Sequence, residues 1–202
     1  MTIALSTNGK LFSTGSILGC GVGHIDTGTF QYTAVPLPVR ISASKVIRQV
    51  SCGASHAGCT TIQGAVYVWG NANGGRLGLG PSVRDCVSVP IVVKALRGLR
   101  ASQISCGNAH SAICTEVASD TSGVMDYITG GEVFVCGNAV ALGKFYTTWT
   151  SIEGLENIKQ VSCGFSHTGA VSVYGECFLW GQNQNECSGK PPEVILIIYL
   201  LY

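Results

Sequence analysis

The sequence predicts an all-β fold of repeated β-propeller blades, and three observations support this. Three segments share the pattern Ser-Cys-Gly-x-x-His and end at His56, His110 and His167; their glycines lie 54 and then 57 residues apart. Short apolar runs alternate with many of the 27 glycines, which is typical of tight turns. No stretch keeps the 3.6-residue hydrophobic period of a core helix. A repeat of about 50 residues built from short strands favours a propeller blade over a solenoid coil.

The first unit, residues 1–46, opens on a predicted hairpin. Two apolar runs, 3–5 and 11–15, flank Asn8-Gly9, a dipeptide that readily adopts the positive φ angles of a tight hairpin turn. The unit therefore begins after the first strand of a blade.

The second unit, residues 47–100, shows the repeat most fully. A strand begins at His56, and a second strand covers residues 66–70. A polar loop, 71–80, leads to a third strand near 87–93. Each unit is expected to hold three to four short strands with tight turns.

The third and fourth units cover residues 101–158 and 159–193. From the histidine to the glycine that closes the next strand there are 14 residues in the second and fourth units, but 27 from His110 to Gly137. The extra 13 residues lie around 118–131. Residues 194–202 are an unbroken apolar tail, too short for a membrane-spanning helix. The tail is either a buried strand or a non-native end.

Composition excludes several classes of protein. Only 11% of residues are charged and the formal net charge is +1, which gives no strong nucleic-acid signal. No signal peptide or membrane span is visible at the N-terminus, so a cytoplasmic or nuclear location is expected. The chain has ten cysteines but no Cys-x-x-Cys pair, so a disulfide framework is the weaker interpretation.

The segment from Cys52 to Gly80 closely resembles the regulator of chromosome condensation repeat: Gly-x-x-His, an apolar strand, an aromatic strand ending Trp-Gly, an Asn-containing loop and Leu-Gly. The match is good over 163–181, weaker over 106–143 and partial over 3–19. The resemblance implies a seven-bladed β-propeller, of which this chain holds about 3.5–4 blades. Four partial units cannot close such a ring, so we expect a fragment of a longer propeller, or an isoform that needs a partner.

The recurring histidines and cysteines have two interpretations. They could form metal or thiol sites, or they could be part of the scaffold, and recurrence in every unit favours the scaffold. The residues assigned to the structural repeat are Gly53, His56, Trp69, Gly70, Gly107, His110, Gly137, Gly164, His167, Trp180 and Gly181. Cys52, Cys106 and Cys163 are expected to act as small apolar side chains.

No catalytic constellation emerges from the sequence. The glycine-rich stretches lack the spacing of phosphate-binding loops, and Asp120, Asp126, Glu153 and Glu156 form no evident acid–base pair. We therefore expect no catalytic residues, metal, cofactor or small-molecule substrate.

Binding is expected in the loops, because propellers present loops on a stiff frame. The candidate binding residues lie in the 71–76 loop, in the 118–131 insertion and after Gly181; a plain solvated loop is the alternative for each. They are Asn71, Asn73, Arg76, Asp120, Asp126, Tyr127, Asn183 and Asn185.

Three functions fit these observations. The first is a protein-interaction scaffold without a catalytic site. The second, implied by the resemblance, is a guanine-nucleotide exchange factor for a Ran-type small GTPase, which would make a small GTPase the partner. The third is an accessory propeller domain of a larger ubiquitin ligase or kinase.

Overall fold

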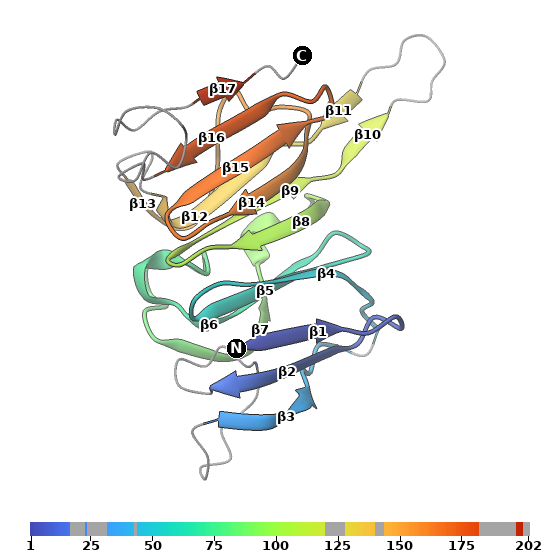
Figure 1. The fold of residues 1–202 in the computed structure, drawn as a ribbon, viewed down its shortest axis with the longest axis vertical. Helices are drawn as coiled ribbons and strands as arrows, with labels where there is room; N and C mark the ends of the chain where they lie inside the picture. Colours follow the sequence, from blue (N-terminus) through green and yellow to red (C-terminus); the bar gives the residue numbers. More distant parts are fainter. Residues whose placement is uncertain are drawn as a thin grey trace.

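The computed structural model describes residues 1–16, 23, 32–42, 44–119, 128–139, 144–181 and 197–199. These residues form four antiparallel sheets and one two-stranded ribbon. The four sheets follow one another along the long axis of the molecule in chain order (Figure 1). We call them blades 1 to 4.

Blades 1 and 2 come from the first half of the chain. The strands of blade 1 are β1 (Thr2–Leu5), β2 (Leu11–Ser16) and β3 (Tyr32–Pro38). The strands of blade 2 are β4 (Ile47–Cys52), β5 (His56–Thr61), β6 (Val66–Asn71) and β7 (Cys86–Val92). β1 pairs with β2 as β5 pairs with β6, so blade 1 lacks a counterpart of β4 among the described residues.

Blades 3 and 4 come from the second half. The strands of blade 3 are β8 (Ala101–Cys106), β9 (His110–Thr115), β12 (Val133–Ala139) and β13 (Lys144–Ser151). The strands of blade 4 are β14 (Ile158–Cys163), β15 (His167–Ser172), β16 (Cys177–Gly181) and β17 (Ile197–Tyr199). Thus a segment of the apolar tail pairs with β16 as the fourth strand of its sheet.

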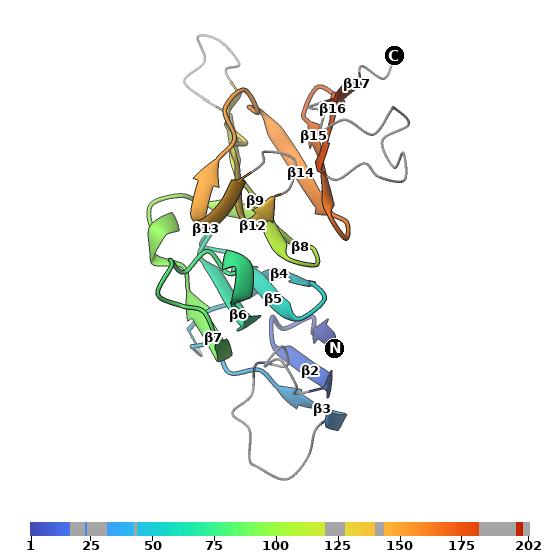
Figure 2. The same cartoon turned by 90° about the vertical axis from the view of Figure 1, so that its left-hand side faces the viewer.

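The insertion of the third unit forms a ribbon of its own. β10 (Val117–Ser119) and β11 (Ile128–Gly130) pair antiparallel between β9 and β12. The ribbon lies on the same side of the molecule as the β1–β2 turn, at the right in Figure 1. Figure 2 shows it rising from blade 3, away from blades 1 and 2.

Helical structure in the described chain is limited to two short 3-10 turns, η1 (Asn73–Gly75) and η2 (Lys94–Leu96). η1 belongs to the loop between β6 and β7, and η2 to the connection from β7 to β8. No helix among the described residues is long and apolar enough to cross a membrane.

A glycine of positive φ closes the second hairpin strand of every blade. In blade 2 it is Gly70, with φ of 107°, where the register between β6 and β7 shifts. A Cβ at Gly70 would also overlap the backbone of Ser55 and His56. Both conditions exclude other residues, which explains why this glycine recurs as Gly137 and Gly181.

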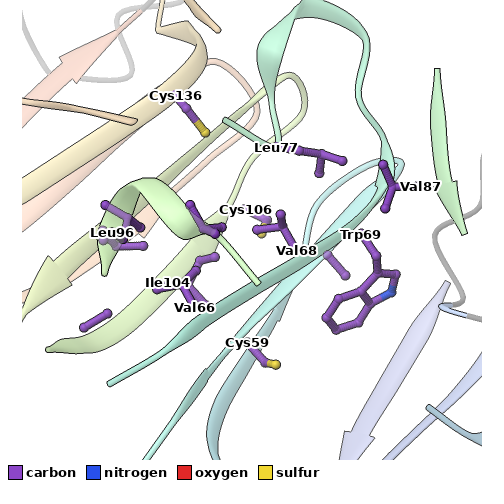
Figure 3. Packing of buried hydrophobic residues seen from close by; sticks show 14 of the residues in the cluster. Cys59, Val66, Val68, Trp69, Leu77, Val87, Leu96, Ile104, Cys106 and Cys136 are labelled. Carbon is purple, nitrogen blue, oxygen red and sulfur yellow. The ribbon is translucent and has the colours of Figure 1, made fainter. Parts of the chain in front are cut away.

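The apolar core fills the spaces between blades. Val66 and Val68 lie on the side of β6 that faces Ile104 of blade 3, whereas Trp69 points to the other side (Figure 3). Trp69, Val68 and Ile104 have no exposed surface. A second cluster joins blades 3 and 4 and includes Trp180. Alternating side chains thus bury both faces of an inner blade.

The predicted fold class is confirmed: the described chain is all-β and built of incomplete-propeller blades. The predicted hairpin around Asn8-Gly9 is present as β1 and β2. The predicted third strand of the second unit is β7.

Candidate functional site

A recurring joint links blade 2 to blade 3, and blade 3 to blade 4, through a histidine. Nε2 of His56 lies 2.8 Å from Oγ of Ser111, at the start of β9 in blade 3. One repeat later, Nε2 of His110 lies 2.9 Å from Oγ1 of Thr168 in blade 4. Both histidines are buried, so the repeated histidine fastens two blades together.

The proton position at the first joint follows from its neighbours. The Ser111 hydroxyl donates to the carbonyl oxygen of Arg76 at 2.8 Å, so it accepts from Nε2–H of His56. Nδ1 of His56 is then a buried acceptor that has no partner in the described chain. Burial, with the nearby charge of Arg76, lowers the pKa of His56 to about 3, and burial lowers that of His110 to about 4. Both rings are neutral near pH 7.

A glycine lies three residues before each histidine, because the imidazole ring fills the space that a side chain at the glycine position would need. A Cβ at Gly53 would overlap the ring of His56 and the carbonyl oxygen of Gly107 in the next blade. Gly107 has the same relation to His110 and to Gly164. The Gly-x-x-His pattern is therefore a packing requirement of the joint.

Two further side chains strengthen each joint, and they come from the first strand of the blade, β4 in blade 2 and β8 in blade 3. The amide of Gln49 donates to the carbonyl oxygen of Ile104 and accepts from its N–H, both at 2.9 Å. Oγ of Ser51 accepts from the N–H of Cys106 at 3.0 Å. Between blades 3 and 4, Gln103 accepts from Val161 and Ser105 from Cys163.

The third copy of the joint residues, on blade 4, has no partner blade in the described part of the chain. Gln160, Ser162 and His167 occupy the positions of Gln49, Ser51 and His56 on blade 4. Their side chains bond to no other described residue. This face of blade 4 offers the same donors and acceptors that hold blades 2, 3 and 4 together.

Of the three cysteines that precede the joint glycines, Cys106 is buried, Cys163 is half-buried and Cys52 is exposed. Burial raises the pKa of Cys59 to about 12 and that of Cys163 to about 11. It also raises the pKa of Cys106 and Cys136, which are both buried. Such thiols are poor nucleophiles near pH 7. No group of three or more His, Cys, Asp or Glu side chains that could hold a metal ion occurs among the residues that the structure describes.

One cysteine departs from the sequence expectation. Seven described cysteines are free thiols, but Cys86, at the start of β7, is disulfide-bonded. Its partner lies outside the described residues. A disulfide, which the sequence analysis gives as the weaker interpretation, is therefore present at Cys86.

The loop between β6 and β7 is held from within by its own polar side chains. Oδ1 of Asn71 accepts from the N–H of Asn73 at 2.8 Å. The Arg76 guanidinium donates to the carbonyl oxygens of Asn73 and Asn108 and to Oγ of Ser55, at 2.7 to 3.0 Å. Arg76 therefore bridges this loop to the turns of blades 2 and 3.

A cavity of about 280 Å³ lies between this loop and β13 of blade 3. The loop is seated on β13 by a hydrogen bond of 2.9 Å from the N–H of Gly80 to the carbonyl oxygen of Thr147. Asn73 and Arg84 line the cavity from the loop, and Phe145 lines it from β13. Phe145 is 68% exposed, which is unusual for an aromatic side chain.

The predicted binding residues divide into three groups. Asn73 lines the cavity, while Asn71 and Arg76 serve the structure of the loop. The remaining candidates lie outside the described residues: Asp120, Asp126, Tyr127, Asn183 and Asn185. Sequence reasoning missed Phe145 and Arg84. The only signal for Phe145 is an aromatic residue beside Lys144 with no counterpart in the other units.

Comparison with known proteins agrees with this geometry. The family model of the regulator of chromosome condensation (RCC1) repeat matches residues 63–114, from the β5–β6 turn of blade 2 into β9 of blade 3. Over these residues the chain is similar to RCC1 repeats. The matched range includes the Trp69-Gly70 strand, the β6–β7 loop and His110.

Two curated relatives contain similar sequence. The chain is 29% identical over 200 residues to the E3 ubiquitin-protein ligase HERC2 of Mus musculus, covering 95% of this chain and 4% of the ligase. It is 33% identical over 143 residues to the X-linked retinitis pigmentosa GTPase regulator of Canis lupus familiaris, covering 66% of this chain and 13% of that protein. The chain thus spans a small part of either relative.

Two solved structures share the fold. Human WBSCR16 superposes with a TM-score of 0.79 at 22% identity, covering 98% of this chain and 49% of that one. Yeast RCC1 (Prp20), solved with bound Kap60, superposes with a TM-score of 0.74 at 18% identity, covering 96% and 46%. At these identities the likeness concerns the fold alone.

Proposed function

We propose that this chain is a protein-interaction scaffold with no catalytic site of its own. The observation that carries the proposal is the cavity between the β6–β7 loop and β13, where an exposed Phe145 and the Arg84 guanidinium stand on a rigid frame. Exposed aromatic side chains and arginines are enriched where proteins bind each other. Because the loop is pinned to two blades, its conformation is set before a partner arrives, which reduces the entropy cost of binding.

A paired-variant capture experiment tests this function. Phe145→Ala combined with Arg84→Ala is compared with Tyr174→Ala combined with Arg97→Ala, which removes the same kinds of exposed side chain elsewhere. Proteins retained by the immobilised chain are quantified by mass spectrometry. We expect the first pair to lose specific partners and the second to keep them. Equal retention by both pairs would exclude the cavity as the binding site.

The ribbon of blade 3 is a second candidate contact region within the scaffold function. Deletion of residues 118–131 removes β11 and most of the insertion while β9 and β12 remain. We expect a subset of captured partners to be lost. An unchanged partner list would remove the ribbon from the proposal.

A second candidate function is guanine-nucleotide exchange on a Ran-type small GTPase. The similarity to a protein named as a GTPase regulator supports it. A stopped-flow measurement of fluorescent-nucleotide release from Ran, with and without this chain, tests it directly. Unaccelerated release at saturating chain would dismiss this function.

A third candidate is an accessory propeller domain of a larger ubiquitin ligase or kinase. The high coverage of this chain by part of HERC2, an E3 ubiquitin-protein ligase, supports it. Sequencing of the full-length transcript tests the proposal: an open reading frame that also encodes a ligase or kinase domain is expected, and a frame without one would reject it.

A further inference from the structure

A second cavity, of about 380 Å³, lies on blade 1 where the β1–β2 turn meets the connection from β3 to β4. Lys10, Arg40 and Lys45 line it, and its apolar lining includes the buried Leu11 and Val39. No carboxylate is among its lining residues, all of which are described. We call it the cationic cavity.

The backbone around the cationic cavity is fixed by hydrogen bonds. In the turn, the N–H of Ser6 donates to the carbonyl oxygen of Lys10 at 2.9 Å, and the N–H of Lys10 donates to Oγ of Ser6 at 3.0 Å. The N–H of Val39 donates to the carbonyl oxygen of Leu11, and that of Lys45 to Ser42, both at 2.9 Å. The three cations therefore extend from a preset frame.

These cations have no ion-pair partner in the described chain. By contrast, Arg48 and Arg100 both pair with Glu116, which lies 2.5 Å from Arg48. Among the described residues, no carboxylate therefore competes with a ligand for the three cations of the cavity.

The other blades show that the scaffold does not require cations at these positions. Arg40, Lys94 and Glu153 each directly follow the residue whose N–H bonds back to the start of the second hairpin strand. Equivalent positions can therefore be assigned in blades 1, 2 and 3. The three positions hold Lys10, Arg40 and Lys45 in blade 1, Ala65, Lys94 and Leu99 in blade 2, and Glu132, Glu153 and Glu156 in blade 3.

The sign of the charge therefore inverts between two blades of the same backbone. The whole sequence follows this asymmetry. Residues 1–100 contain nine Lys and Arg but two Asp and Glu, whereas residues 101–202 contain three Lys and Arg but nine Asp and Glu. The formal net charge of +1 conceals this separation.

We propose that the cationic cavity of blade 1 binds an acidic segment of a partner protein, with carboxylates on the three cations and an aliphatic side chain against Leu11 and Val39. The apolar lining matches a peptide better than a sugar–phosphate backbone. The acidic side chains of blade 3 would repel a nucleic acid that continued across the face. A second copy of the chain fits poorly, because the acidic set of blade 3, among the described residues, occupies the same position on the same backbone as the cations.

The acidic blade also gives the interaction an orientation. A partner that carries carboxylates is attracted at blade 1 and repelled two blades away, and such complementarity fixes register and raises the association rate. This inference rests on the proposed scaffold function but uses a different site from the cavity at Phe145.

Fluorescence anisotropy with a labelled peptide of glutamate and leucine tests the proposal. The probe is titrated with the full chain, with Lys10→Gln/Arg40→Gln/Lys45→Gln, and with Lys94→Gln/Arg97→Gln/Lys159→Gln, which removes equal charge from exposed sites. We expect about a tenfold or larger loss of affinity in the first variant and little change in the second. Hydrogen exchange should show protection of residues 6–11 and 38–47 on peptide binding.

Several results would overturn the proposal. These are equal losses in both triple variants, equal binding of a peptide in which glutamine replaces glutamate, and tighter binding of oligothymidine than of the peptide. A dimer in sedimentation that dissociates only in the first variant would assign the cavity to a second copy instead. The Phe145 variants leave the cationic cavity intact, so they can lose partners while peptide binding persists. Failure of the proposed scaffold site and failure of the peptide-binding proposal are therefore distinguishable.

Discussion

His56 and Ser111 lie 55 residues apart in sequence, yet Nε2 of the ring is 2.8 Å from the serine hydroxyl across the boundary between blades 2 and 3. Because the hydroxyl also donates to Arg76, one histidine ties together a strand, a neighbouring blade and a loop. His167, at the equivalent place on blade 4, has no such partner in the described chain. His167 therefore serves as an internal control for the contribution of the His56 hydrogen bond.

Replacing the joint histidines should destabilise the protein according to their partners. We expect His56→Ala to lower the free energy of unfolding by about 2–4 kcal/mol, from a lost hydrogen bond and a buried cavity. His167→Ala should lower it by less than about 1 kcal/mol. Urea unfolding followed by tryptophan fluorescence measures both. Equal effects would mean that the histidine acts within its own blade and does not join two blades.

Acid should weaken the joints. The pKa of His56 and His110 is lowered to about 3 and about 4 in the folded chain, from an ordinary 6.5. The unfolded chain therefore binds more protons below pH 6.5, and stability falls with pH from there toward 4. The slope should approach about 1.4 kcal/mol per pH unit for each histidine.

Thermal midpoints measured between pH 7 and pH 5 test this dependence. The matched variant is His56→Gln/His110→Gln, which should show a flatter profile from a lower starting point. A wild-type midpoint that stays constant or rises as the pH falls to 5 would contradict the assignment of neutral, buried rings.

The glutamine clamp offers a second matched pair. Gln49 bonds to both backbone groups of Ile104, whereas Gln160 bonds to no other described residue. Gln49→Leu should lower the free energy of unfolding by about 1–3 kcal/mol, because it leaves backbone groups without partners. Gln160→Leu should have little effect in the same urea experiment. A larger loss from Gln160→Leu would show that the open face of blade 4 is covered in solution.

Thiol accessibility should follow burial. Cys59, Cys106 and Cys136 are buried with raised pKa, so iodoacetamide at pH 8 should modify them only on unfolding. Cys52 is exposed and should react in the folded protein. Partial burial of its thiol raises its pKa, so the reaction should be slower than that of a free cysteine. Cys86 should be modified only after reduction. Peptide mass spectrometry identifies each site, and early modification of Cys136 would show that blades 2 and 3 separate.

The sequence was most informative where the environment repeats. Gly53, His56 and Gly70 sit in one local geometry that recurs in blades 3 and 4, so the pattern itself marked them as scaffold. Phe145 and Arg84 have no repeat equivalents that mark them, and only the approach of a loop to a neighbouring blade brings them together.

Arg76 illustrates the same limit from the opposite direction. Its position in a polar loop predicted recognition of a partner, but its guanidinium bonds to Ser55 and Asn108 in two blades. A sequence cannot distinguish a cation that faces solvent from one that bonds to turns 21 and 32 residues away. The inversion of charge between Lys10 and Glu132 likewise became visible only when the backbone defined which positions are equivalent.

The joints also determine how local unfolding spreads from one blade to another. Each of these hydrogen bonds of the joints spans 55 or 58 residues, so within the described chain they couple blade 2 to blade 3 and blade 3 to blade 4. Such a chain behaves as a one-dimensional array whose total stability is a sum of blade and boundary terms. Damage at one boundary should then leave distant blades folded, and melting should proceed inward from the outermost blades.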